Sequence, residues 1–122
     1  MNRLPDFPAA KIITCILPDE GQDMALLKAL RREKGVITAN TFQSRGFGLQ
    51  LRRRYMGKRQ VAAYSVRVVT VVVRADQADD LFEYIFYRVN FDHSCPGLIY
   101  QGNLLAVTPY TLPAGVLEEK GE

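Results

Sequence analysis

The most informative segment of this chain is Val66-Arg67-Val68-Val69-Thr70-Val71-Val72-Val73. It consists mainly of β-branched side chains and shows almost no alternation of apolar and polar residues, which is typical of a strand covered on both faces. It is the second half of a predicted strand that spans 61–73. We therefore expect helices to cover one face of this strand and another surface to cover the other.

Three further strands are predicted on either side of this stretch. The first is β-branched and apolar and stops at Pro18. The second follows Gly35, and the third follows Gly97. In chain order these strands span 11–17, 36–43 and 98–107.

Two amphipathic helices are predicted between the strands. The first follows the acidic cluster 19–23, which suits a helix N-terminus, and it ends at Gly35. Its apolar residues are Met24, Leu26, Leu27 and Leu30. The second helix is expected to be capped by Asp76. Its apolar face, at helical spacing, consists of Ala78, Leu81, Phe82, Ile85 and Val89.

The resulting order β-α-β-β-α-β is the split βαβ, or ferredoxin-like, pattern. The predicted fold class is therefore α+β, with a four-stranded antiparallel sheet and two helices on one face. The other face would carry many valines, and large exposed apolar surfaces usually mark an interface. The sequence thus predicts a homo-oligomer joined through the sheet.

Composition is consistent with one globular domain: the chain has 122 residues, of which 48% are hydrophobic and 24% charged. We expect a single domain over 9–112, an N-terminal arm over 1–8 and an acidic tail over 113–122. The first residues lack the apolar core of a signal peptide, and the longest apolar run is far too short to span a membrane. A cytoplasmic location is expected.

The net charge of +3 is unevenly distributed. Six basic residues and no acid lie between Arg45 and Gln60, whereas the rest of the chain carries ten basic and thirteen acidic side chains. We predict that 44–60 is a long loop, and such loops are usually functional or disordered. A solvated loop and an anion-binding or docking segment both fit this pattern. The expected partner-binding residues are Arg52, Arg53, Arg54, Tyr55, Lys58 and Arg59.

The tetrapeptide Arg45-Gly46-Phe47-Gly48 allows two interpretations. Two glycines around one residue let a backbone approach a phosphate closely, with amide donors available, but a simple turn would use the same residues. The tetrapeptide also matches the first four positions of an RNA-recognition motif. However, Leu49 and Leu51 stand where a stacking aromatic is needed, so this alternative is disfavoured.

No catalytic or metal-binding residue is predicted. Asp92-His93-Ser94-Cys95 contains the only histidine of the chain, and zinc needs at least three protein ligands. A polar loop is the favoured interpretation of this segment, and an enzyme or metal site there ranks last. Cys15 lies in an apolar strand and is expected to be a buried thiol.

From Lys11 to about Val107 the chain resembles the PII signalling superfamily, the trimeric nitrogen-regulatory proteins and their relatives. The resemblance rests on the opening Lys-Ile-Ile-Thr strand, on Gly-Phe-Gly before a long connection and on the passage 71–79 into the second helix. It also rests on Pro-Gly-Leu-Ile-Tyr at 96–100, in the place of the family's glycine loop. The trimeric copper-tolerance family shares the fold, but the Gly-Phe-Gly placement favours PII.

This resemblance implies a homotrimeric, non-enzymatic regulator whose segment 44–60 corresponds to the T-loop, which docks on transporters and enzymes. It implies no required cofactor, and an anionic effector, with ATP, ADP and AMP as candidates, in clefts between subunits. The ligand-binding residues expected on this basis are Thr38, Arg45, Gly46, Phe47, Gly48 and Gly97.

The chain departs from the family pattern at phosphate-binding positions. Leu98 stands where the family has a lysine, and Pro109 and Thr111 stand where it has two arginines. Tyr55 lacks the Ala-Glu-Tyr context of the family's uridylylated tyrosine. An altered ligand preference is therefore expected. The alternative function, ranked second, is a nucleic-acid-binding module that uses the basic segment without a signalling ligand.

Overall fold

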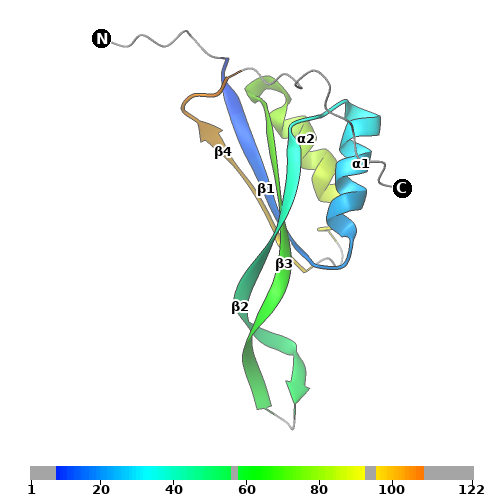
Figure 1. Cartoon of the computed structure of the whole chain (residues 1–122), viewed down its shortest axis with the longest axis vertical. Helices are drawn as coiled ribbons and strands as arrows, with labels where there is room; N and C mark the ends of the chain where they lie inside the picture. The colour runs from blue at the N-terminus through cyan, green and yellow to red at the C-terminus, as the bar shows by residue number, and fades with distance from the viewer. Residues whose placement is uncertain (1–7, 56–57, 93–95, 109–122) are drawn as a thin grey trace.

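The computed structural model describes residues 8–55, 58–92 and 96–108. The predicted order of elements is confirmed (Figure 1). The elements are β1 (Ala10–Pro18), α1 (Gln22–Lys34), β2 (Ala39–Tyr55), β3 (Lys58–Arg74), α2 (Ala75–Arg88) and β4 (Leu98–Leu104).

The four strands form one antiparallel sheet in the order β2-β3-β1-β4. The valine-rich segment 66–73 belongs to β3, which pairs with β1 from Ala10↔Arg74 to Pro18↔Val66 and with β2 on its other side. Figure 1 shows both helices on the same side of the sheet. The predicted α+β, ferredoxin-like fold class is therefore confirmed.

The core lies between the sheet and the two helices. Alternate residues of the central strands point into it, and those of β1 (Ile13, Cys15 and Leu17) are almost fully buried. Leu30 of α1 and Ile85 of α2 are also fully buried and belong to the same cluster. The predicted burial of Cys15 is confirmed.

Helix α1 begins differently from the prediction. Gly21 in the left-handed conformation precedes it, no side chain caps it, and Asp23 lies buried in its first turn. Met24 was expected in the core but is 41% exposed, because the buried face of the helix runs through Leu26 and Ala29 instead. The end of the helix agrees with the prediction: the amide of Gly35 donates to the carbonyl of Arg31.

Helix α2 begins at Ala75, with Arg74 in the capping position and no side-chain cap. The prediction that Asp76 caps this helix is therefore wrong. Asp76 lies in the first turn, where its carboxylate pairs with Arg74 at 2.7 Å. The predicted apolar face is confirmed, since Ala78, Leu81, Ile85 and Val89 are buried and Phe82 packs against them.

The largest difference concerns 44–60, where the prediction of a long loop is wrong. Strands β2 and β3 continue through this segment as a two-stranded hairpin that extends well past the rest of the sheet (Figure 1). We call the part beyond the pair Ser44↔Val66, residues 45–55 and 58–65, the ribbon. In a two-stranded antiparallel ribbon each strand pairs about half of its backbone groups with the other strand, and the outward-facing groups need water or another partner.

Pairing in the ribbon is regular from Arg45↔Ser65 to Leu49↔Val61 and resumes at Arg54↔Arg59. Between these pairs the register shifts, with residues 50–53 of β2 standing against Gln60 alone. Bulges of this kind bend a strand and redirect its side chains. The other boundaries differ by a few residues: β2 starts at Ala39 rather than 36, and β4 ends at Leu104 rather than 107.

The sheet face away from the helices carries an apolar row that crosses all four strands. Phe42, Val68, Ile16 and Leu98 occupy facing register positions. The outer two residues are about half exposed, at 49% for Phe42 and 53% for Leu98. We call these four residues the apolar row. The next row is more polar, and in it Thr70 Oγ1 donates to Asn40 Oδ1 at 3.0 Å.

Candidate partner-binding ribbon and its base

Arg45, Gly46, Phe47 and Gly48 lie inside β2, opposite residues 62–65 of β3. The tetrapeptide is thus neither a turn nor a loop, and both predictions of its local structure are wrong. It forms the start of the ribbon, with Arg45 exposed at its base. Whether its backbone holds a phosphate stays a prediction.

The six residues predicted to bind a partner lie in the outer part of the ribbon. Arg52 and Arg53 belong to the irregular segment of β2, and Tyr55 pairs with Lys58 next to the tip. Arg54 and Arg59 stand directly opposite each other. The register therefore brings basic positions of both strands together in this part of the ribbon.

Gly97 lies at the same end of the sheet as Gly46, but at the opposite edge. Gly97 immediately precedes β4, whose first residue Leu98 faces Ile16, whereas Gly46 lies in β2, opposite Tyr64. Strands β3 and β1 stand between them, and three strand spacings amount to about 14 Å. One chain therefore does not close a single phosphate site around both glycines, and the expected cleft needs a second chain.

Thr38 lies towards the other end of the sheet. Its hydroxyl donates to the carbonyl of Val72 at 2.5 Å. Eight positions along β3 separate Val72 from Tyr64, the partner of Gly46, which corresponds to about 27 Å in a strand. The structure thus does not place Thr38 together with the two glycines in one chain.

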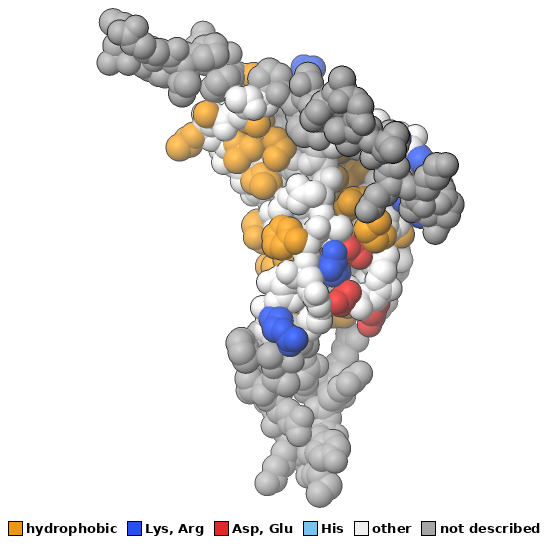
Figure 2. All heavy atoms as spheres, viewed as in Figure 1, with side chains coloured by type: hydrophobic (Ala, Val, Ile, Leu, Met, Phe, Trp, Pro, Cys, Tyr) orange, Lys and Arg blue, Asp and Glu red, His pale blue; other side chains and the backbone are white. Residues whose placement is uncertain are grey.

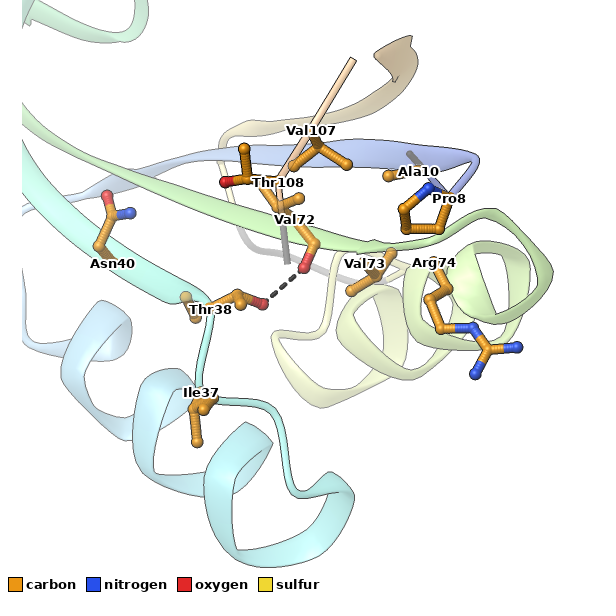
Figure 3. Close-up of a pocket in the computed structure, with 11 residues that line it drawn as sticks. Pro8, Ala10, Ile37, Thr38, Asn40, Val72, Val73, Arg74, Val107 and Thr108 are labelled. Carbon is orange, nitrogen blue, oxygen red and sulfur yellow. Dashed lines mark hydrogen bonds between the residues drawn. The ribbon is translucent and has the colours of Figure 1, made fainter. Parts of the chain in front are cut away.

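Thr38 lines a pocket of about 440 Å³ (Figure 3). Its walls include Ile37, Val72 and Val107, and in Figure 3 the guanidinium of Arg74 points away from Thr38. Arg74 is instead paired with Asp76. The pocket therefore suits an uncharged, largely apolar group better than a phosphate.

The base of the ribbon is held by polar contacts on the helix side of the sheet. Asp23 Oδ2 accepts hydrogen bonds from Thr41 Oγ1 at 2.7 Å and from Arg67 Nε at 3.0 Å. Asp23 is only 3% exposed, and the Arg67 side chain is 22% exposed. The first turn of α1 is thereby joined to both strands of the hairpin.

The protonation of Asp23 reflects these contacts. Burial is the largest single influence and would raise its pKa, but hydrogen bonds from Thr41, Arg67 and the Met24 backbone, with the positive charge of Arg67, act in the opposite direction. Together they leave the pKa of Asp23 below the ordinary value of 3.8. Asp23 is therefore ionised at neutral pH and forms a true ion pair with Arg67.

A second carboxylate, that of Asp19, accepts hydrogen bonds from residues nearer the ribbon. Asp19 Oδ2, at the corner between β1 and α1, accepts from Ser65 Oγ at 2.6 Å and from Gln43 Nε2 at 3.4 Å. Gln43 Nε2 also donates to Ser65 Oγ at 2.8 Å, which links β2 to β3 directly. We call the two acids and their four partners, Thr41, Gln43, Ser65 and Arg67, the clamp. No sequence motif predicts the clamp, because its residues come from three separate parts of the chain.

Charged side chains gather near the start of the ribbon on the described surface, and hydrophobic side chains gather at the opposite end of the sheet (Figure 2). Within residues 8–55, 58–92 and 96–108, no group of three or more His, Cys, Asp and Glu residues could hold a metal ion. His93 and Cys95 lie outside these ranges, as do the tail 113–122 and nearly all of the arm 1–8. No helix in the described part of the chain is long and apolar enough to cross a membrane.

Comparison with known proteins supports the fold. No protein-family model matches the sequence, and no curated protein matches it either. Among solved structures, GlnK from B. subtilis is similar, with a TM-score of 0.59 and 18% identity over 80% of this chain and 86% of that chain. The complex of B. subtilis GlnK with ATP gives a TM-score of 0.60, 16% identity and coverages of 80% and 85%.

Two CutA structures are equally similar. The periplasmic divalent cation tolerance protein CutA from Archaeoglobus fulgidus gives a TM-score of 0.57, 18% identity and coverages of 81% and 87%. CutA from Pyrococcus horikoshii gives a TM-score of 0.59, with 21% identity over 80% of this chain and 87% of that chain. The fold implied by the resemblance to PII proteins is confirmed. The expectation that Gly-Phe-Gly favours PII over the copper-tolerance family stays a prediction.

Proposed function

We propose that this protein is a non-enzymatic, PII-like regulator that forms a homotrimer, binds a small anionic effector between subunits and docks on a partner through its basic ribbon. The observation that carries the proposal is the ribbon itself. It projects from a fold shared with GlnK and CutA, and its sequence has six basic residues between Arg45 and Gln60 without one acid.

The charge of the ribbon favours an acidic docking surface, with the cytoplasmic face of a membrane transporter as the expected example. The ribbon extends away from both helices (Figure 1), and the sequence from Arg45 to Gln60 carries six basic residues and no acid. Complementary charge mainly speeds the encounter of two proteins, so this docking would be fast and sensitive to salt.

The two glycine positions support an effector site between chains. Gly46 and Gly97 lie at one end of the sheet on opposite edges, so a neighbouring copy could bring the β4 edge of one chain to the β2 edge of another. B. subtilis GlnK has been solved in complex with ATP. Because Leu98 replaces the family's lysine, we expect weaker phosphate binding than in a typical PII protein. Adenine nucleotides, including ADP and AMP, remain the first effectors to test.

The apolar row supports assembly through the open sheet face. Phe42 and Leu98 are about half exposed at its two ends, and Tyr100, next to Leu98 on the same face, is 48% exposed. Burying such side chains against a second copy would contribute about 25 cal/mol per Å² of apolar surface. We therefore expect the trimer to be the stable form in solution.

The decisive experiment measures the melting temperature with ATP, ADP, AMP and GTP at constant ionic strength. A nucleotide at about one hundred times its Kd stabilises the folded state by about 2.7 kcal/mol. We expect an adenine nucleotide to raise the melting temperature while inorganic pyrophosphate does not. Equal shifts with every polyanion, or none, would contradict a specific effector site.

The second candidate, a nucleic-acid-binding module, is favoured by one observation. The basic segment is a two-stranded antiparallel ribbon, and such ribbons fit the major groove of duplex DNA. The same protein titrated with duplex DNA and with single-stranded RNA at two salt concentrations distinguishes the candidates. Tight, salt-dependent binding of nucleic acid without nucleotide stabilisation would place this function first.

A further inference from the structure

We propose that Asp19 and Asp23 are positioning residues that fix the direction in which the ribbon leaves the domain. This assignment concerns the mechanics of the ribbon and holds for either class of partner considered above. It is carried by the clamp, whose contacts lie where the four-stranded sheet narrows to two strands.

The ribbon needs such a device because sheet pairing ends at its base. Strand β1 stops at Pro18, opposite Val66, and from there outward β2 is the only strand in the described part of the chain that pairs with β3. A two-stranded hairpin is at best marginally stable in water, and such ribbons twist more freely than wide sheets. Backbone pairing alone would therefore leave the angle between ribbon and domain poorly determined.

The clamp provides contacts on one face at this point. Gln43 pairs with Arg67 in the register, and Thr41 and Ser65 lie one step inward and one step outward on the same face. Asp23 accepts hydrogen bonds from Thr41 of β2 and Arg67 of β3. Asp19 accepts hydrogen bonds from Gln43 of β2 and Ser65 of β3. Each carboxylate therefore bridges β2 and β3 along a diagonal.

Diagonal bridges resist the motions that remain open to a hinge. A bend of the ribbon away from the helices would lengthen the bond from Ser65 to Asp19, and a sliding of β2 against β3 would break both diagonals. Both acids belong to the β1–α1 corner and the first turn of α1, next to buried Leu17 and Leu26. The ribbon is thus fixed to the rigid part of the domain.

Hydrogen exchange on the full-length protein without any partner tests this assignment. The variant Asp19→Ala/Asp23→Ala removes both carboxylates, and Asp76→Ala is the matched control because it removes an exposed ion pair at the other end of β3. We expect amides of 45–49 and 61–65 to exchange at least tenfold faster in the double variant. Amides of Ile13, Cys15 and Val71 should change less than twofold, and the control should change neither set.

A milder variant, Gln43→Ala/Ser65→Ala, removes the outer contacts without leaving the buried Asp23–Arg67 pair incomplete. It should accelerate exchange in the ribbon by a smaller factor and leave the core unchanged. Unchanged ribbon exchange in both variants would overturn the assignment. So would equal acceleration of ribbon and core in the milder variant, because the residues would then support the whole fold. Neither result bears on what the ribbon binds.

Discussion

Gly97 lies so close to the carbonyl oxygen of Ile16 that a β-carbon at position 97 would overlap it. The ring of Phe91 closes the same space, with its Cε1 at 3.2 Å from the position of that β-carbon. Because the nearest atom belongs to the backbone of a central strand, it cannot move aside as a flexible side chain would. The glycine is thus required where the chain enters β4, whether or not a ligand also uses it.

Gly97→Ala should therefore destabilise the fold by about 1–3 kcal/mol, as overpacking commonly does. Gly102→Ala is the matched control in β4: no atom lies within 4 Å of its added β-carbon, so it should be neutral or stabilise by up to about 1 kcal/mol. Urea denaturation of both variants measures the difference. Equal stabilities would show that the contact with Ile16 does not constrain position 97.

Removal of the Asp23 carboxylate should have an effect that depends on pH. The pKa of Asp23 is lowered in the folded protein, so its stabilising effect is present above the unfolded value of about 3.8 and is lost as pH falls through the folded pKa. Asp23→Asn should cost about 1–3 kcal/mol at pH 7. The difference in the free energy of unfolding between this variant and the wild type should narrow below pH 3.8. Denaturation at several pH values checks this, and a constant gap would contradict the ion pair with Arg67.

Replacing Arg52, Arg53 and Arg54 by serine should slow binding to an acidic probe such as polyglutamate by about tenfold at low salt. The change should cost under about 0.5 kcal/mol of stability per residue, since surface substitutions rarely cost more. Stopped-flow kinetics at two salt concentrations measures the rate. The variant Lys28→Ser/Arg32→Ser/Arg88→Ser loses the same charge from the helices. Should it slow binding equally, overall charge rather than the ribbon steers the encounter.

Phe42→Asp and Leu98→Asp should weaken assembly without unfolding the chain. Both side chains are about half exposed in the isolated chain, so a charge there is tolerated until a second copy covers it. Sedimentation velocity at micromolar concentration should show the wild type as a trimer and the variants as smaller species. Tyr87→Asp, on α2 and 56% exposed, is the control on the helix side. A wild-type monomer would refute assembly through the apolar row.

The valine-rich stretch and the two helical patterns were sufficient to predict the fold, because burial imposes a clear period on apolar residues. The sequence of the ribbon predicts a loop because its many charges obscure a weaker strand signal. Phe47, Leu49 and Leu51 alternate with polar residues or glycine, which is the period of a strand. Where water surrounds both faces, polarity no longer separates strand from loop.

The clamp also left a trace in the sequence. Arg67 is the one charged residue within the valine-rich stretch, and a partly buried guanidinium requires an anionic partner. Asp23 was instead interpreted as part of an acidic helix start. The sequence could not identify the pair, because 44 positions separate the two residues and only the sheet register brings them together.

The ribbon has a consequence for solubility. Among the residues that the structure describes, no third strand pairs with either edge of the ribbon, and exposed edges are templates for pairing with other molecules and for aggregation. The bulged register between Leu49 and Arg54 and the run of arginines oppose such pairing, because an irregular, like-charged edge cannot align with its own copy. The charges that would attract a partner therefore also keep these ribbons apart from one another in a concentrated solution.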